Sequence, residues 1–442
     1  MNKEQTILQN AFAAALAVAE PKKIVSGYLA NIFPPGFEPK GKCLVVGAGK
    51  ASASMASALE LHAKNCWPQA ELNGVVLTRY GHGSSTEFIR IIEAGHPVPD
   101  QAGMDGAKEV LRLVNQLGEG DLMIALVSGG GSSLLTLPQN GISIEDMQNT
   151  TEALLRSGAP IEEMNVVRKH LSAILGGNLA RVAISRGARV EALLISDVTS
   201  DLPADISSGP CASDYSTYRD ALTILEKYQL DENSLPASVL RHLNRGRDGE
   251  IPETLKEDDL RCAQVKNHVI ATAYKSLEAA AEYVRGQGYD PIILGDDITG
   301  EAQDVGVKQA AIARKYSLGR QPSSLPIAII SGGECTVTLP PGTKGRGGRC
   351  SEFLLSLFIA SEDIGSLSAL AADTDGIDGS ENNAGAWFTE GIRRDCYKKG
   401  MNPVKFLSSH DCYGFFAELG ALVETGPTLT NVNDFRIILI DN

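Results

Sequence analysis

The sequence has 442 residues, of which 43% are hydrophobic and 21% charged, and this composition excludes a disordered chain. The 40 Lys and Arg residues against 54 Asp and Glu residues leave a net charge of -14, so the overall field repels nucleic acid and anionic membranes. The eight cysteines form no C-x-x-C pair, which gives no sign of a disulfide framework or a thiolate zinc site and favours the cytoplasm.

The first half of the chain repeats apolar, β-rich segments, each followed by glycine and then by a helical stretch. Strands are expected over residues 43–46, 74–78, 89–94, 122–127 and 190–195. Continuous apolar strands that alternate with helices predict a mostly parallel sheet covered on both faces. The first domain is therefore expected to be a doubly wound α/β domain.

Between residues 231 and 261 the chain becomes polar, charged and proline-containing, and we place the domain boundary there. The expected domains cover residues 1–245 and 262–442. The second is also expected to be α/β with a mostly parallel sheet, with strands near residues 269–273, 291–294, 326–330, 367–372 and 436–440. Ligands bind outside the carboxyl ends of the strands in open α/β sheets, so two such domains predict an active site in the interdomain cleft.

A Gly-Ala-Gly-Lys turn at residues 47–50 follows a predicted strand and opens a helix. Backbone N–H groups at such a turn favour an anion, which makes Gly49 and Lys50 candidates. Ser52 stands where the dinucleotide fingerprint needs glycine or alanine, and the spacing of a Walker loop is missing. A tight turn with a surface lysine is the alternative.

The segment Ser-Gly-Gly-Gly-Ser-Ser at residues 128–133 lies in an uncharged run that indicates a strand, a glycine loop and a helix start rather than a membrane span. Consecutive glycines allow a phosphate or carboxylate to approach the backbone N–H groups. A flexible loop is the alternative. The candidate anion-binding residues are Ser128, Gly129, Gly130, Gly131 and Ser132.

Two further segments of the first half carry charged candidates. Arg168 and Lys169 lie off the apolar face of a predicted helix, where a solvated face is the alternative to a binding site. Asp197 follows the apolar strand that ends at residue 195, the usual position of a catalytic base or a metal partner. Helix capping is the alternative for this aspartate.

Another glycine segment ends a strand of the second half, and its candidates are Ser331, Gly332, Gly333 and Glu334. It is followed by a glycine-rich run in which Lys344, Arg346 and Arg349 would repel one another without an anion. This favours phosphate binding over a single RNA-binding segment in an acidic protein.

Asp373 and Asp375 end a further strand. Carboxylates without His or Cys suit Mg²⁺, which is held by one or two carboxylates together with substrate phosphates. An Asx turn is the alternative.

These motifs occur in order with Ala-Gly-His-Pro-Val-Pro-Asp at residues 94–100, Ser-Gly-Pro at 208–210, and Thr-Gly-Pro-Thr and Asn-Val-Asn-Asp within 425–434. In this combination the sequence resembles, over nearly its full length, the glycerate 2-kinase family. The C-terminal half of that family is called the MOFRL domain, and its members have often been labelled hydroxypyruvate reductases. The resemblance implies a Rossmann-like first domain and transfer of the γ-phosphoryl group of MgATP to the 2-hydroxyl of D-glycerate.

The resemblance also implies roles for the candidate residues. Lys50 would stabilise the transferring phosphoryl group, Arg349 would do the same or bind the glycerate carboxylate, and Asp197 would accept the hydroxyl proton. The two glycine segments would hold phosphates. The substrate-binding candidates are Arg168, Lys169 and Arg346, the metal-binding candidates are Asp373 and Asp375, and the cofactors are ATP and Mg²⁺.

Several positions depart from the family pattern, among them residues 380–383. Leu175 and Asn178 stand where two cations are usual, and Cys350 and Ser351 replace an amide pair. A related small hydroxy or sugar acid is therefore an alternative substrate. The sequence also leaves open an NAD(P)H-dependent hydroxypyruvate reductase and a non-catalytic phospho-ligand-binding protein. The expected partners are small molecules, without nucleic acid or membrane, and a homodimer is compatible with the sequence.

Overall fold

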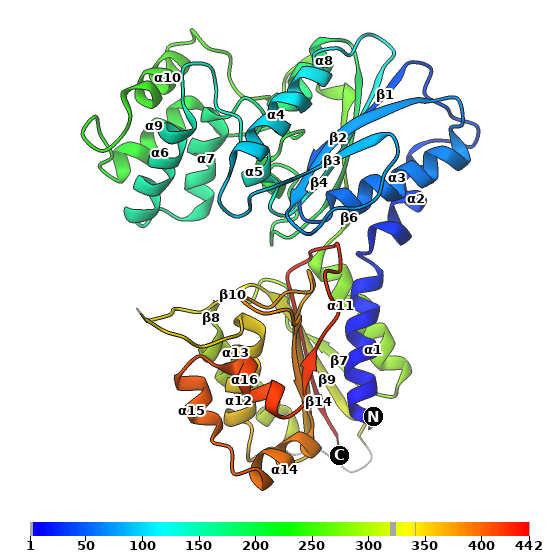
Figure 1. Ribbon diagram of the computed structural model, residues 1–442, viewed down its shortest axis with the longest axis vertical. Helices are drawn as coiled ribbons and strands as arrows, with labels where there is room; N and C mark the ends of the chain where they lie inside the picture. Colours follow the sequence, from blue (N-terminus) through cyan, green and yellow to red (C-terminus); the bar gives the residue numbers. More distant parts are fainter. Residues whose placement is uncertain (1–2, 319–323, 341, 442) are drawn as a thin grey trace. The chain divides into compact units, whose positions relative to one another are not determined.

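The computed structural model describes residues 3–318, 324–340 and 342–441, and the chain divides into two compact units (Figure 1). The first unit is Ile24–Ile270. The second unit combines Met1–Lys23 with Ala271–Asn442. Within the described residues, no helix is both long and apolar enough to cross a lipid bilayer.

The first unit contains a six-stranded sheet in the order β3-β2-β1-β4-β5-β6. The pairs β1–β2, β2–β3, β1–β4 and β4–β5 are parallel. This order confirms the doubly wound α/β expectation, and its switch point lies between β1 and β4. The strands are β1 (Lys42–Ala48), β2 (Glu71–Arg79), β3 (Ile89–Ala94), β4 (Leu122–Ser128), β5 (Arg189–Ile195) and β6 (Val265–Ala271).

The strands of this sheet are apolar throughout because both faces are covered. In β1, Leu44 and Val46 belong to the core cluster shared with α4 and α8, and the intervening Val45 is also fully buried. The helices next to the sheet are α2 (Pro21–Ile32), α3 (Ser52–Cys66), α4 (Gln101–Val114), α5 (Gly131–Leu134) and α8 (Asn178–Ser185).

Four helices of the first unit form a separate bundle with its own core around Leu154, Val167 and Tyr218. Capping boxes start two of them, at Ser143 before α6 and at Thr217 before α9. The helices are α6 (Ile144–Arg156), α7 (Ile161–Leu171), α9 (Tyr218–Lys227) and α10 (Ala237–Arg247), and two short 3-10 helices, η1 (Ile206–Ser208) and η2 (Leu260–Gln264), complete the unit.

The strand predicted at residues 269–273 exists, but it was assigned to the wrong sheet. It is β6, which lies next to β5 in the first unit, and His268 of β6 donates to the buried Glu191 of β5 at 2.6 Å. A short apolar run indicates a strand without indicating its partner. Tertiary contacts of this kind select the sheet.

The second unit contains a six-stranded sheet in the order β13-β12-β11-β14-β9-β7. Only β7 and β9 pair in parallel, and the other four pairs are antiparallel, so the expected mostly parallel sheet is wrong for this unit. The apolar runs that suggested parallel strands report burial on both faces, which an antiparallel sheet between helices also provides. Its strands are β7 (Asp290–Ile293), β9 (Ile327–Gly333), β11 (Leu367–Asp373), β12 (Gly385–Phe388), β13 (Leu422–Val423) and β14 (Asp434–Ile440), and a separate pair is formed by β8 (Gly300–Glu301) and β10 (Cys335–Thr336).

The N-terminal helix α1 (Lys3–Ala17) packs in the second unit, although residues 1–245 were expected to form one domain. Leu8 and Phe12 on its apolar face join the core of the second unit, where the rings of Phe12 and Phe435 lie 5.6 Å apart. The sequence shows an amphipathic helix without showing which core receives it. The remaining helices of this unit are α11 (Ala273–Gly286), α12 (Ala302–Ser317), α13 (Arg349–Ala360), α14 (Glu390–Lys398), α15 (Pro403–Ser408) and α16 (Cys412–Glu418).

Candidate active site

The turn that carries Lys50 is joined to the triple-glycine loop by backbone hydrogen bonds. The N–H of Lys50 donates to the carbonyl of Gly129 at 2.9 Å, and the N–H of Ala51 donates to Oγ of Ser128 at 3.0 Å. A side chain at Gly49 would collide with Ser128, so glycine is required for this approach. The two predicted anion-binding segments therefore meet at the switch point of the first sheet, where α/β sheets bind ligands.

Ser207 and Ser208 hold the triple-glycine loop, and neither was among the predicted site residues. Oγ of Ser207 donates to the carbonyl of Ser128 at 2.6 Å and accepts from the N–H of Gly131 at 3.0 Å. The hydroxyl groups of Ser132 and Ser208 lie 2.9 Å apart. The Ser-Ser-Gly-Pro sequence at 207–210 was the available signal. Because Gly131 donates its N–H to Ser207, that group is engaged within the protein.

Asp197 lies at the same edge of the sheet as the triple-glycine loop, because both follow the carboxyl ends of neighbouring parallel strands. Ser128 at the end of β4 is in register with Ile195 at the end of β5, and Asp197 follows two residues later. Its side chain is half-buried. The strand order thus places the candidate base beside the strand that ends in the candidate phosphate loop.

Arg168 and Lys169 are neighbours on α7 but have different surroundings. The guanidinium of Arg168 bonds to Asn165 at 3.1 Å and pairs with no carboxylate among the described residues. Burial lowers its pKa. A partly buried cation of this kind suits an anionic ligand.

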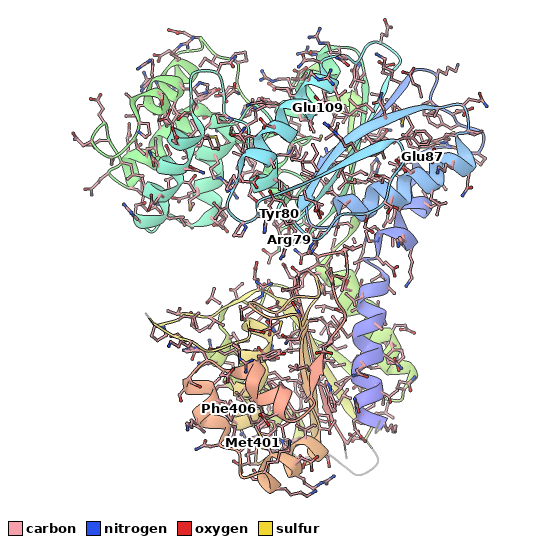
Figure 2. All side chains as sticks on the ribbon, viewed as in Figure 1. Arg79, Tyr80, Glu87, Glu109, Met401 and Phe406 are labelled. Atoms are coloured by element: carbon pink, nitrogen blue, oxygen red, sulfur yellow. The ribbon has the colours of Figure 1, made fainter. Side chains whose placement is uncertain are left out.

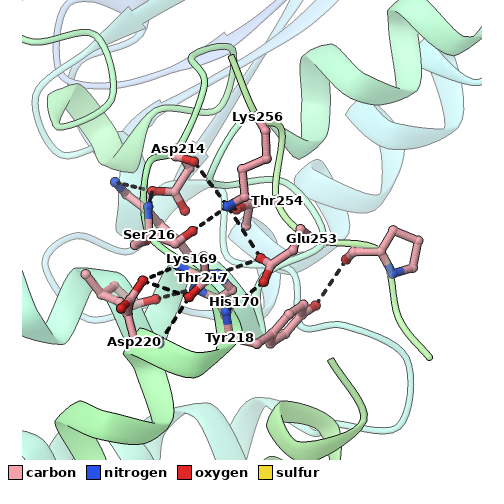
Figure 3. A network of polar contacts seen from close by, with 12 residues as sticks. Lys169, His170, Asp214, Ser216, Thr217, Tyr218, Asp220, Glu253, Thr254 and Lys256 are labelled. Atoms are coloured by element: carbon pink, nitrogen blue, oxygen red, sulfur yellow. Dashed lines mark hydrogen bonds and ion pairs between the residues drawn. The ribbon is translucent and has the colours of Figure 1, made fainter. Parts of the chain in front are cut away.

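Lys169 belongs instead to a polar network inside the first unit (Figure 3). Its side chain is 4% exposed, and its Nζ lies 3.5 Å from Oδ1 of the buried Asp214. The next residue, His170, contacts Glu253 at 3.2 Å, and Glu253 also lies 3.4 Å from Lys256. These contacts give Lys169 a structural role in holding α7.

Arg349 begins α13 in the second unit and contacts three carboxylates. Nε bonds to Asp434 at 2.7 Å, Nη2 bonds to Asp373 at 2.8 Å, and Nη1 bonds to Glu334. Burial opposes the charge of Arg349, but these carboxylates together raise its pKa. Asp373 and Asp434 are buried, whereas the side chain of Glu334 is 56% exposed.

The positive charges of the glycine-rich run are therefore balanced largely by the protein itself. Besides the pairs of Arg349, Arg346 lies 3.4 Å from Asp411 and 5.0 Å from the centre of the Tyr413 ring. Carboxylates distant in sequence thus supply counter-charges for Arg346 and Arg349, and phosphate binding by this run stays a prediction.

Residues 331–333, which were expected to form a phosphate-binding loop, continue a strand instead, and phosphate binding by this segment stays a prediction. Ser331, Gly332 and Gly333 belong to strand β9, where Ser331 is buried and accepts from Gln309 at 2.9 Å. Only Glu334 stands beyond the strand. Glycines after an apolar run suggested a loop, but these glycines continue strand β9, which lies between β7 and β14.

The two aspartates expected to bind metal are already engaged. Oδ2 of Asp373 accepts from Arg349, and its Oδ1 accepts from the N–H of Asp375 at 3.0 Å. Oδ1 of Asp375 accepts from the N–H of Ile377 at 2.9 Å, as in an Asx turn. In the part of the chain that the structure describes, no three His, Cys, Asp or Glu side chains are arranged to hold a metal ion.

Four of the departures from the family pattern, at Leu175, Asn178, Cys350 and Ser351, occupy buried positions. Leu175 lies in the core of the first unit, and Asn178 is buried with its amide donating to the carbonyl of Ser172 at 2.9 Å. The N–H groups of Cys350 and Ser351 donate to the carboxylate of Asp378. All four residues are buried within their own units.

Comparison with known proteins places the chain in a family. A model described as a domain of unknown function, DUF4147, matches residues 7–244, and the MOFRL family matches residues 327–434. A protein from Agrobacterium vitis whose name assigns it to the hydroxypyruvate reductases is 44% identical over 98% of this chain and 94% of its own. The glycerate 2-kinase of Pyrococcus horikoshii is 40% identical over 96% of this chain and 92% of its own.

A solved structure agrees with this assignment. The glycerate kinase of Thermotoga maritima is 35% identical and matches with a TM-score of 0.85, covering 99% of each chain. The similarity extends through both units and confirms the resemblance inferred from the ordered motifs. The chain belongs to the glycerate kinase family in which a DUF4147 domain precedes a MOFRL domain.

Proposed function

We propose that the protein is a glycerate 2-kinase, which transfers the γ-phosphoryl group of ATP to the 2-hydroxyl of D-glycerate. The observation that carries the proposal is the hydrogen bond between Lys50 and Gly129, which brings a lysine and a glycine loop to the switch point of a doubly wound sheet. The names of the Pyrococcus and Thermotoga relatives support the same reaction.

The proposed reaction balances with two substrates and two products. The bond between the γ-phosphorus and the oxygen that bridges it to the β-phosphate breaks, and a bond forms between this phosphorus and the 2-hydroxyl oxygen. ADP leaves with the bridging oxygen, 2-phospho-D-glycerate forms, and the hydroxyl proton passes to a base. Phosphoryl transfer requires mainly positioning of the reactants and stabilisation of charge on the phosphoryl oxygens.

The first unit offers a residue for each of these requirements. We assign the transferring phosphoryl group to Lys50 and the triple-glycine loop, and the hydroxyl proton to Asp197. The guanidinium of Arg168, which pairs with no carboxylate of the described chain, is assigned to the glycerate carboxylate.

The roles of Arg349, Asp373 and Asp375 in the second unit are proposed from the family resemblance alone. Arg349 can bind a phosphoryl group only with the donors that its three carboxylates leave available, or by releasing Glu334, the most exposed of them. Carboxylate oxygens of Asp373 and Asp375 accept hydrogen bonds from the protein itself, and we assign no step to a metal ion. The requirement for Mg²⁺ and the sharing of one ligand by both domains stay predictions.

The decisive experiment incubates the protein with MgATP and D-glycerate, measures ADP release, and identifies the product by phosphorus NMR. We expect 2-phospho-D-glycerate. ADP release only with another small hydroxy or sugar acid would move the assignment to that substrate. No ADP release with any such acid would overturn the kinase.

The name of the Agrobacterium relative makes hydroxypyruvate reduction the second candidate. This reaction needs a nicotinamide cofactor, and the third glycine of the dinucleotide fingerprint is Ser52 here. Oγ of Ser52 donates to the carbonyl of Leu126 at 2.9 Å and takes part in the contact between α3 and β4. Loss of NADH absorbance with hydroxypyruvate would establish the reductase, and we expect none.

We also propose that the protein works in the cytoplasm, since all eight cysteines are free thiols in the structure. A homodimer remains a prediction of the sequence, for which sedimentation of the purified protein is the test.

A further inference from the structure

The loop after β3 brings an imidazole to the triple-glycine loop. A methyl group added to Gly130 would lie 2.6 Å from Nε2 of His96. Gly130 also has a φ of 83°, which favours glycine. His96 is half-buried, so its ring packs against the protein and keeps an accessible part.

This contact requires the loop after β3 to pass over other strand ends. In the sheet, β2 and β1 lie between β3 and β4, and neighbouring strands are about 4.8 Å apart. The loop that carries His96 therefore crosses the carboxyl ends of β2 and β1 before it reaches Gly130. Lys50 follows the end of β1 and bonds to Gly129, so His96 and Lys50 adjoin consecutive residues of one loop.

A hydrogen-bonding network fixes the loop that carries His96. Oδ1 of Asp100 accepts from the N–H of Gly103 at the start of α4 at 3.0 Å. Its Oδ2 accepts from the hydroxyl of Tyr80 at 2.7 Å, and Tyr80 stands just beyond the end of β2 (Figure 2). The imidazole is therefore presented by a loop held at its C-terminal end.

We propose that His96 is a further catalytic residue of the kinase, whose Nε2 donates a hydrogen bond to a phosphoryl oxygen held at the triple-glycine loop. The proposal rests on the proposed function. Gly131 gives its N–H to Ser207, so this backbone donor is lost to an anion at the loop, and a side-chain donor such as His96 would replace it. Hydrogen bonds to an anionic oxygen are about twice as strong as neutral ones, and a protonated imidazole nitrogen can make one.

Two substitutions separate hydrogen bonding from packing. In His96→Gln the side-chain amide nitrogen can occupy the place of Nε2, whereas in His96→Asn the shorter amide reaches only the place of Nδ1. We expect kcat of His96→Asn to fall about a hundredfold and kcat of His96→Gln to stay within about tenfold of the wild type. His268→Gln on β6 is the control, because its amide nitrogen can take the place of Nε2 and still donate to Glu191, and we expect unchanged kinetics.

The outcomes are distinct. Equal activity of both His96 variants, whether retained or lost while the folded spectrum is kept, would overturn the proposal, because only a donor at Nε2 separates Gln from Asn. Calorimetric measurement of ADP binding tests the role of His96 in phosphate binding independently of whether the protein is a kinase. A wild type without kinase activity whose ADP binding is weakened by His96→Asn alone would refute the kinase and retain His96 as a phosphate-binding residue.

Discussion

The N–H of Lys50 lies 2.9 Å from the carbonyl oxygen of Gly129, and this bond joins the loops that follow β1 and β4. The two residues are 79 positions apart in the sequence. They meet because β1 and β4 are neighbours in a parallel sheet, in which Ala48 is in register with Val127. The bond holds the backbone of Lys50 beside the triple-glycine loop, with which its side chain is proposed to bind the phosphoryl group.

Removal of the Lys50 side chain tests its assignment to the phosphoryl group. In Lys50→Ala the backbone bond to Gly129 remains, so we expect an unchanged melting temperature and a kcat lowered about a hundredfold or more. Steady-state ADP release and thermal unfolding measure the two effects. Lys64→Ala, which removes an exposed lysine paired with Glu87, is the control with wild-type turnover. Normal turnover of Lys50→Ala would remove this lysine from the mechanism.

Ser207 is expected to stabilise the triple-glycine loop. Ser207→Ala leaves the N–H of Gly131 without its acceptor and the carbonyl of Ser128 without its donor. We expect the free energy of unfolding to fall by about 1–3 kcal/mol, measured by urea denaturation. Ser185→Ala removes an exposed hydroxyl that bonds within α8 and should change it by less than about 0.5 kcal/mol. Equal stability of the two variants would contradict the role of Ser207.

Arg349 is expected to contribute to stability independently of catalysis. Arg349→Met removes the cation from the buried Asp373, and leaving a buried charge without its partner costs about 3–5 kcal/mol. Glu334→Gln removes only an exposed partner and should cost less than about 1 kcal/mol. Chemical denaturation of both variants checks the difference. A stable Arg349→Met protein would show that the carboxylate cluster tolerates the loss of its cation.

The network of Glu253 predicts a dependence of stability on pH. Burial opposes the charge of Glu253, but bonds from His170 and from the N–H of Tyr218, together with the charge of Lys256, lower its pKa to about 2. A lowered pKa contributes stability above the unfolded value near 4.5, and this contribution disappears as the pH falls toward 2.

The measurement compares Glu253→Gln with the wild type by thermal unfolding between pH 7 and pH 2. We expect the variant to be less stable at pH 7 and the difference to narrow below about pH 4.5, where the unfolded carboxylate takes up a proton. Glu250→Gln, whose exposed carboxylate pairs with Arg245, serves as the control. A difference that stays constant over this range would exclude the ionisation of Glu253 as its cause.

The strands of both sheets that precede the candidate residues could be predicted from local pattern. Apolar runs are continuous wherever both faces of a strand are buried, and glycine after such a run marks the strand end, as at Gly49 and Gly129. The same signal predicted a strand end before Gly332, but the strand continues through Gly333. His96 and Ser207 were missed as site residues because their contacts join segments far apart in sequence.

The sequence by itself determined the alternation of strands and helices, the turn at Lys50, the triple-glycine loop and, through its ordered motifs, the family. Only the tertiary structure decided that β6 joins the first sheet, that α1 packs in the second unit, that the second sheet is mixed, and that Arg349 is surrounded by carboxylates. Burial and backbone preference are recorded in a few neighbouring residues, whereas the choice of partner depends on the free energies of contacts between residues that only the folded chain brings together.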